Sequence, residues 1–229
     1  MTVDEKIQFF FKLPVVPASE AGITEVVANY PGETCKKFST LYLLRKDMAN
    51  CFSGSPMYWL GAIAMLSGID LMAKLYAGTD TVNFIRTRFK NFVNDRMNGE
   101  GDDVWRLRNA LMHSYGVFFD VPDPAGAGAP SIDKRFRLTA HAVPPASGYT
   151  GNLFNIGAAP NVLEIDIMNL KSRFESSIVS YKAHLEANPA DKAAKFEPMF
   201  EKYGWIYICE KQTDIGGTCL LLDGASGGF

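Results

Sequence analysis

Apolar residues recur every three or four positions in four successive segments of this chain, which predicts four amphipathic helices. The segments cover about 33–52, 55–77, 79–97 and 102–115. Gly78 follows the second segment, and glycine commonly ends a helix because it adopts the left-handed conformation without strain. Since helices with short connections pack against their neighbours in the chain, these segments indicate an antiparallel bundle.

The rest of the chain predicts extended structure around a second helical region. Residues 1–33 contain several helix-breaking Pro and Gly residues, so we expect an extended arm with IQFFFKL as a short strand. The segments VFFDV, RFRLTAH and VLEIDI alternate between apolar and polar residues, as short strands do. A long helix is expected at 168–186, and WIYICE and TCLLL predict a terminal hairpin.

The predicted fold class is therefore mainly α. An antiparallel helical bundle would carry a small β appendage, built from the termini and from residues 116–167. The expected parts are an extended amino-terminal arm (1–33), a bundle core (34–120), a loop with short strands (121–167), helices packing on the bundle (168–203), and a hairpin with a flexible tail (204–229).

Composition narrows the functional classes. Hydrophobic residues make up 47 % of the chain and charged residues 21 %, which is typical of an ordered globular protein. The formal net charge of −2 gives no overall attraction to nucleic acid or to an anionic membrane, so any RNA contact must be local. The apolar run 57–69 is shorter than the about 20 residues that span a bilayer, and the chain opens without a signal sequence. We therefore expect a cytoplasmic protein with no membrane partner.

The cysteines, histidines and glycines predict no metal and no cofactor. The four cysteines are widely spaced and form no CxxC or Cys/His cluster, so neither a zinc site nor a disulfide framework is expected. The glycine-rich stretches lack the strand, loop and helix context of a phosphate-binding loop. His141 and His184 have no partner at motif spacing, and we expect both to be structural or exposed.

The fourth predicted helix contains an unusual charge. At 100° per residue, Arg108 falls in the apolar sector together with Tyr115, whereas Asn109 and His113 share another face. A buried arginine keeps its charge and needs a carboxylate or phosphate partner. Asp70, one turn before Lys74 on the most apolar helix, could supply the carboxylate and tie the two helices together. Spacing alone leaves this structural interpretation and a functional site both open.

The segment from Arg108 to Tyr115 resembles the signature of the HEPN superfamily. That signature is an arginine, four to six residues and a histidine, with a polar residue after the arginine, here Asn109. A tyrosine two positions after the histidine, here Tyr115, resembles the longer form in HEPN toxins that pair with nucleotidyltransferase antitoxins. The motif also lies late in a helical bundle, after a very apolar helix that carries a polar residue.

The resemblance implies a metal-independent endoribonuclease that needs no cofactor. His113 would act as general acid or base, Arg108 would bind the phosphorane oxygens, and Asn109 would orient the histidine or hold a phosphate oxygen. Tyr115 would contact RNA or receive nucleotides from an antitoxin. Asp70 and Lys74 are expected beside the bound substrate.

The same resemblance implies a homodimer with a role as a toxin or in defence against phage. Arg108 and His113 lie about 140° apart on one helix, so a single copy aims them poorly at one bond. Family members generally dimerise with their motif helices meeting, which would bring the two groups together. Two alternatives stay open: a non-catalytic HEPN-like module that binds a nucleotide or a protein, and a helical scaffold.

A basic segment precedes the motif helix. Arg86, Arg88 and Lys90 alternate with other residues and could form an edge that guides RNA. The interleaved phenylalanines have helical spacing, which favours a core position for them instead.

Overall fold

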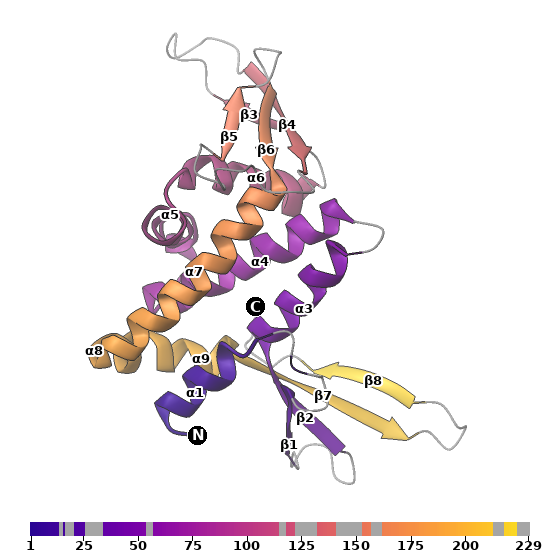
Figure 1. The fold of residues 1–229 in the computed structure, drawn as a ribbon, viewed down its shortest axis with the longest axis vertical. Helices are drawn as coiled ribbons and strands as arrows, with labels where there is room; N and C mark the ends of the chain where they lie inside the picture. Colours follow the sequence, from indigo (N-terminus) through magenta and orange to yellow (C-terminus); the bar gives the residue numbers. More distant parts are fainter. Residues whose placement is uncertain are drawn as a thin grey trace.

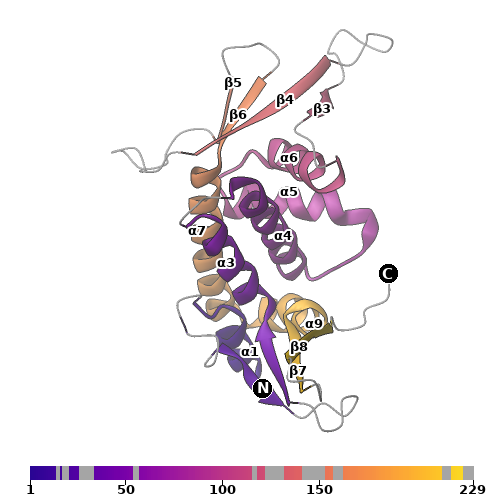
Figure 2. The same ribbon diagram turned by 90° about the vertical axis from the view of Figure 1, so that its right-hand side faces the viewer.

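The computed structural model describes residues 1–13, 16, 21–25, 34–53, 57–114, 118–121, 132–140, 153–156, 162–212 and 218–223. This part of the chain is mainly helical, as predicted, with two small sheets at opposite ends of the bundle (Figures 1 and 2). The helices are α1 (Val3–Phe10), α3 (Thr40–Cys51), α4 (Tyr58–Ala77), α5 (Ile85–Arg96, after the 3-10 turn η1, Val82–Phe84), α6 (Gly101–Ser114), α7 (Ile167–Ala187), α8 (Pro189–Asp191), the π-helical turn η2 (Lys192–Phe196) and α9 (Glu197–Tyr203).

The apolar helix α4 forms the centre of the bundle. It contacts α3, α5, α6 and α7, and residues along most of its length are buried. At Gly68 the helix α7 approaches so closely that an added Cβ would lie 2.7 Å from the ring of Phe174. Gly78 ends α4 with a φ of 68°, so this helix ends where the sequence predicts.

By length and composition α4 could also cross a membrane. It has 20 residues and a mean hydropathy of 1.4 in its most apolar window, of which 56 % is buried inside the protein. A core helix of a soluble protein passes the same test, so length and composition alone do not assign α4 to a membrane.

The two sheets join distant parts of the chain. One has the order β1-β2-β7-β8 and is antiparallel throughout, from β1 (Ile23–Glu25), β2 (Thr34–Ser39), β7 (Trp205–Gln212) and β8 (Thr218–Asp223). The other has the order β3-β4-β6-β5, from β3 (Phe118–Val121), β4 (Ile132–Thr139), β6 (Val162–Asp166) and β5 (Phe154–Ile156). Its central strands β4 and β6 are parallel. The strands predicted at VFFDV, RFRLTAH and VLEIDI and the terminal hairpin are therefore present, whereas the strand predicted at IQFFFKL is wrong because most of that segment belongs to a helix.

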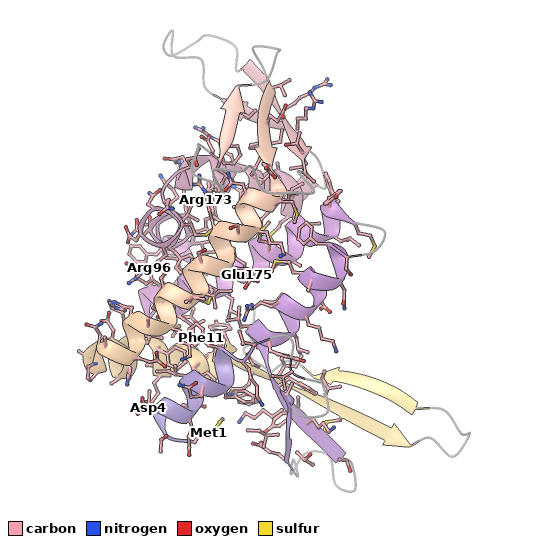
Figure 3. The ribbon with its side chains drawn as sticks, viewed as in Figure 1. Met1, Asp4, Phe11, Arg96, Arg173 and Glu175 are labelled. Carbon is pink, nitrogen blue, oxygen red and sulfur yellow. A yellow bond between two sulfur atoms is a disulfide. The ribbon has the colours of Figure 1, made fainter. Side chains whose placement is uncertain are left out.

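The expected extended arm is wrong for its first residues, which form helix α1. Thr2 accepts a hydrogen bond from the Glu5 backbone, and the Glu5 side chain accepts one from the Thr2 backbone, which completes a capping box. Ile7 and Phe10 lie on the buried side of this helix, and the C-cap residue Phe11, which Figure 3 labels, is also buried. The helix-breaking Pro and Gly residues that predict an extended arm begin only at Pro14, after this helix has ended.

The predicted helix at 33–52 also starts later than expected. Residues 34–39 form strand β2, and Ser39 caps α3 by accepting a hydrogen bond from the Tyr42 backbone. β2 pairs with β7, so Cys35 lies opposite Cys209 and the two form a disulfide across 174 positions. The expectation of no disulfide is therefore wrong, because sequence spacing does not show which strands become neighbours. Such bonds are common in oxidising compartments and rare in cytoplasmic proteins.

Candidate functional site

Arg108 lies between α6 and α4, as expected from its place in the apolar sector. Only 12 % of its side chain is exposed, and its Nη2 lies 3.5 Å from Oδ2 of Asp70, which is 18 % exposed. Its Nη1 donates a hydrogen bond of 3.2 Å to Oδ1 of Asn109. The guanidinium carbon lies 5.1 Å from the centre of the Trp105 ring. These contacts fix the plane of the guanidinium, which is the geometry that recognition of a phosphate requires.

Asp70 is incompletely satisfied by this pair. Its Oδ1 is buried and has no hydrogen-bond partner within the part of the chain that the structure describes. A buried carboxylate oxygen without a donor costs free energy, so this position is compatible with a donor from a bound molecule or a second subunit.

Lys74 lies one turn beyond Asp70 on α4, and its Nζ is 4.4 Å from the centre of the Tyr203 ring. Burial lowers the pKa of Lys74. The carboxylate of Asp70 opposes that shift, whereas the positive charges of Arg88 and Arg108 add to it. Lys74 and Asp70 thus lie in a region where cations outnumber carboxylates, as a site for an anionic substrate requires.

The other motif residues are only partly described. Position 113 belongs to α6, one turn after Asn109, so the two positions share a face of the helix. The side chain of His113 lies outside the described part of the structure, as does all of Tyr115. The structure therefore brings together Arg108, Asn109 and Asp70, with Lys74 one turn along α4.

The expected basic edge on α5 is not a single surface. Arg86 and Lys90 are on one face of α5, and both pair with Asp102, at 3.4 Å and 2.7 Å. The Lys90 ammonium holds the pKa of Asp102 below its ordinary value. Arg88 points into the protein, and Phe89 and Phe92 are fully buried, so the core position expected for the aromatic residues is confirmed for these two. It is wrong for Phe84, which is 55 % exposed because it lies in the turn before α5 and not on the buried face of the helix.

Of the two remaining histidines, His184 lies in the described part of the structure. His184 is structural: its Nε2 lies 2.8 Å from Oδ2 of Asp191, and its ring stacks on Tyr181 near the end of α7. His141 lies outside the described residues.

Sequence reasoning misses a buried ion pair between α7 and the turn before α6. Arg173 donates from Nη1 to Glu100 at 3.0 Å and to the Met97 carbonyl at 3.3 Å. Glu100, at a φ of 67°, also accepts hydrogen bonds from the backbone of Leu153 and Phe154, so it connects the bundle to β5. No local signal predicts a contact between positions 73 residues apart.

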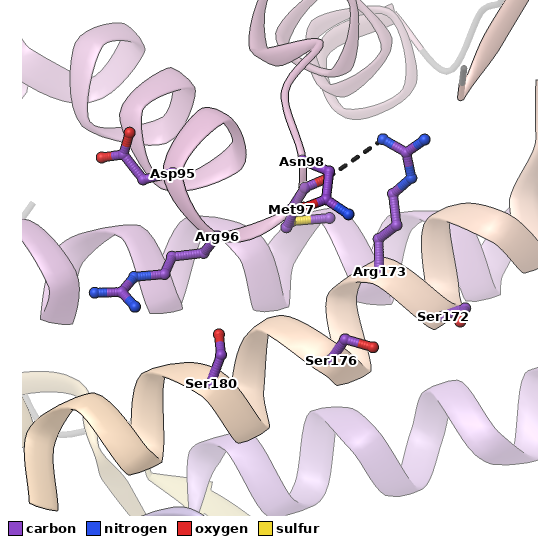
Figure 4. Close-up of a pocket in the computed structure, with 8 residues that line it drawn as sticks. All are labelled: Asp95, Arg96, Met97, Asn98, Ser172, Arg173, Ser176 and Ser180. Atoms are coloured by element: carbon purple, nitrogen blue, oxygen red, sulfur yellow. Dashed lines mark hydrogen bonds between the residues drawn. The ribbon is translucent and has the colours of Figure 1, made fainter. Parts of the chain in front are cut away.

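Arg173 borders a polar cavity of about 400 Å³ between α5 and α7 (Figure 4). Ser176 and Ser180 of α7 line this cavity, and Asp95 and Arg96 line it from the end of α5. Glu100 already neutralises Arg173, and the Arg96 guanidinium lies over the rings of Tyr76 and Tyr181, so we assign no ligand to this cavity.

No family model, no curated protein and no solved structure matches this chain.

Proposed function

We propose that this chain is a HEPN-like, metal-independent endoribonuclease that acts as a homodimer. The observation that supports the proposal most is the immobilised guanidinium of Arg108, held by Asp70 on one side and by Asn109 on the other. A guanidinium held in this way is preorganised for the charge that develops on a phosphodiester during cleavage.

The reaction needs only proton transfer and charge stabilisation. The 2′-OH of the RNA attacks the adjacent phosphorus, a bond forms between that oxygen and phosphorus, and the bond to the 5′-oxygen breaks. His113 removes the proton from the 2′-OH or supplies one to the leaving 5′-oxygen, since imidazole titrates near neutrality. Arg108 binds the phosphorane oxygens, and Lys74 adds positive charge on the α4 side. The products carry a 2′,3′-cyclic phosphate and a 5′-OH.

In the proposed dimer, Arg108 of one subunit faces His113 of the other. The two positions differ by about 140° around α6, so an isologous contact between the two motif helices is the simplest way to aim both at one phosphodiester. Asn109 shares the face of position 113 and would orient the imidazole. If the chain is the toxin of a toxin–antitoxin pair, a nucleotidyltransferase antitoxin would attach nucleotides to Tyr115. The attached nucleotides would add negative charge and bulk beside the cleavage site.

The proposal is tested by RNA cleavage in excess chelator. We expect the wild type to release products with 2′,3′-cyclic phosphate ends, and His113→Ala and Arg108→Ala to lose this activity while they remain folded. Arg106→Ala is the matched control, because Arg106 lies on the same helix but pairs with Asp103 in a more exposed position. Equal cleavage by the wild type and both motif variants would refute the assignment.

A second candidate function is that of a helical scaffold, and the Arg108–Asp70 pair is the observation that favours it. If the pair only joins α4 to α6, Arg108→Ala lowers the stability of the protein and the wild type has no nuclease activity under any of these conditions. Loss of stability in Arg108→Ala is expected for both candidates, so the cleavage measurement separates them.

A further inference from the structure

Arg88 is a buried arginine that has no carboxylate partner among the residues that the structure describes. Among the described residues three arginines are buried, and two of them pair with a glutamate: Arg45 with Glu175, and Arg173 with Glu100. Arg88 is the most buried of the three, at 4 % exposed, and no carboxylate oxygen lies within 4.0 Å of it in the described part of the chain.

The hydrogen bonding of Arg88 is also incomplete. Its Nη1 donates to the Thr81 carbonyl at 3.0 Å, whereas its Nε is buried and has no hydrogen-bond partner among the described residues. A guanidinium cannot lose its proton near neutral pH, so its charge persists in the interior. An unpaired charge in this environment costs several kcal/mol, which an anion bound beside it would offset.

A cavity of about 350 Å³ provides room for such an anion. Arg88 lines it together with the end of α4, the turn before α5, and Lys195 of η2. Lys195 keeps its Nζ 3.0 Å from Asp191 and is 41 % exposed, so it can reorient toward a ligand. The carboxylate in the lining, Asp95, accepts a hydrogen bond from Tyr76.

The charges around Arg88 favour an anion. Lys74 is near enough that the positive charge of Arg88 helps to lower its pKa, after the larger effect of burial. Arg88, Lys74 and Arg108 thus lie in one region, in which the Asp70 carboxylate pairs with Arg108. Asp80, the other carboxylate that acts on Lys74, is held by Tyr203 and Lys202.

The cavity also offers an aromatic wall. Phe84 lines the cavity and is 55 % exposed, so its ring is accessible to a bound molecule. Thr87 and Asn91 add a hydroxyl and an amide to the lining. The volume falls in the range of small-molecule sites, and an exposed ring can stack on a planar group.

We propose that this cavity binds an aromatic phosphate monoester, with the phosphate against Arg88 and the ring against Phe84. The donors around the cavity are a guanidinium, an ammonium and a hydroxyl, which suit the three oxygens of a phosphate better than the two of a carboxylate. Neither Arg108 nor Asp70 lines this cavity, and the existence of the proposed site does not depend on nuclease activity.

The probe for this proposal is phenyl phosphate, titrated into the full chain by calorimetry. Inorganic phosphate tests the contribution of the ring, and benzoate tests the preference for phosphate. We expect phenyl phosphate to bind at least about tenfold more tightly than either of the other two probes. Absence of phenyl phosphate binding at millimolar concentration, or equal binding of benzoate, would overturn the proposal.

Variants locate the bound probe. Arg88→Met is expected to weaken binding of phenyl phosphate at least about tenfold. The melting temperature should stay unchanged or rise, because the substitution leaves no described carboxylate buried without its partner. Phe84→Ala removes an exposed side chain, so the fold persists, and affinity should fall about threefold to tenfold. Arg86→Met, on the exposed face of the same helix, is the control and should bind normally. If Phe84→Ala also binds normally, the probe lies elsewhere and the proposal is wrong.

Discussion

The ion pair between Arg108 and Asp70 should be worth about 2 kcal/mol of coupling, and a double-mutant cycle can measure it. The variants are Arg108→Met, Asp70→Asn and the double substitution. At 3.5 Å and an effective dielectric constant of about 20, the attraction between the two charges is about 5 kcal/mol. Desolvation of two mostly buried groups opposes this attraction and cancels more than half of it, which leaves a coupling of about 2 kcal/mol, within the range of about 0.5–3 kcal/mol found for residues in contact.

Urea unfolding of the four proteins gives the coupling free energy directly. The exposed pair of Arg106 and Asp103 on the same helix is the control, and its coupling should be no more than about 0.5 kcal/mol. A coupling between Arg108 and Asp70 below about 0.5 kcal/mol would refute the view that Asp70 holds the guanidinium in place. In the proposed nuclease, Asp70→Asn should also lower the rate of RNA cleavage, because Arg108 loses its orientation.

Three further predictions concern the fold. Gly68→Ala should destabilise the protein by about 1–3 kcal/mol in urea unfolding, because the added methyl group overlaps an aromatic ring of α7; an unchanged midpoint would contradict this packing. Replacing Cys35 and Cys209 by serine should cost about 2–5 kcal/mol relative to the oxidised protein, and an equal stability of the two would show that the bond does not form in solution. The Tyr203 hydroxyl holds the pKa of Asp80 below its ordinary value of 3.8, so this contact stabilises the fold above that pH and its contribution is lost as the pH falls through the lowered pKa. Tyr203→Phe should therefore lower the melting temperature at neutral pH by more than it does in strong acid, and a difference that does not shrink in acid would contradict the assignment.

The bundle could be predicted because its signals are local. The apolar stripe of α4 and the left-handed Gly78 that ends it are both visible within one segment of sequence. The acidic first turn of α6, Asp102 and Asp103, likewise marks the start of that helix. Helix α1 is hard to predict because its start is marked only by the capping box of Thr2 and Glu5, whereas many helix-breaking residues follow from Pro14 onward.

Long-range pairing could not be predicted in the same way. The disulfide depends on β2 and β7 becoming neighbours, and the Glu100–Arg173 pair depends on α7 packing beside the turn before α6. Neither leaves a periodic signal in the sequence.

The candidate site was predicted in part. Arg108 and Asp70 are each the charged exception on an apolar helix face, and such exceptions tend to meet in the interior. The run of basic residues suggests one edge for Arg86, Arg88 and Lys90, but Arg88 lies in the core. Residues two positions apart on a helix point to opposite sides, so Arg86 and Lys90 face solvent when Arg88 faces the core.

The most direct test of the central claim is to mix two inactive variants, Arg108→Ala and His113→Ala, under conditions in which subunits exchange. If each cleavage site takes the guanidinium from one subunit and the imidazole from the other, half of the dimers are mixed and each mixed dimer has one intact site. The mixture should then recover about a quarter of the wild-type rate of RNA cleavage in chelator. A mixture that stays inactive, while the wild type cleaves and the subunits demonstrably exchange, would contradict a site shared between subunits.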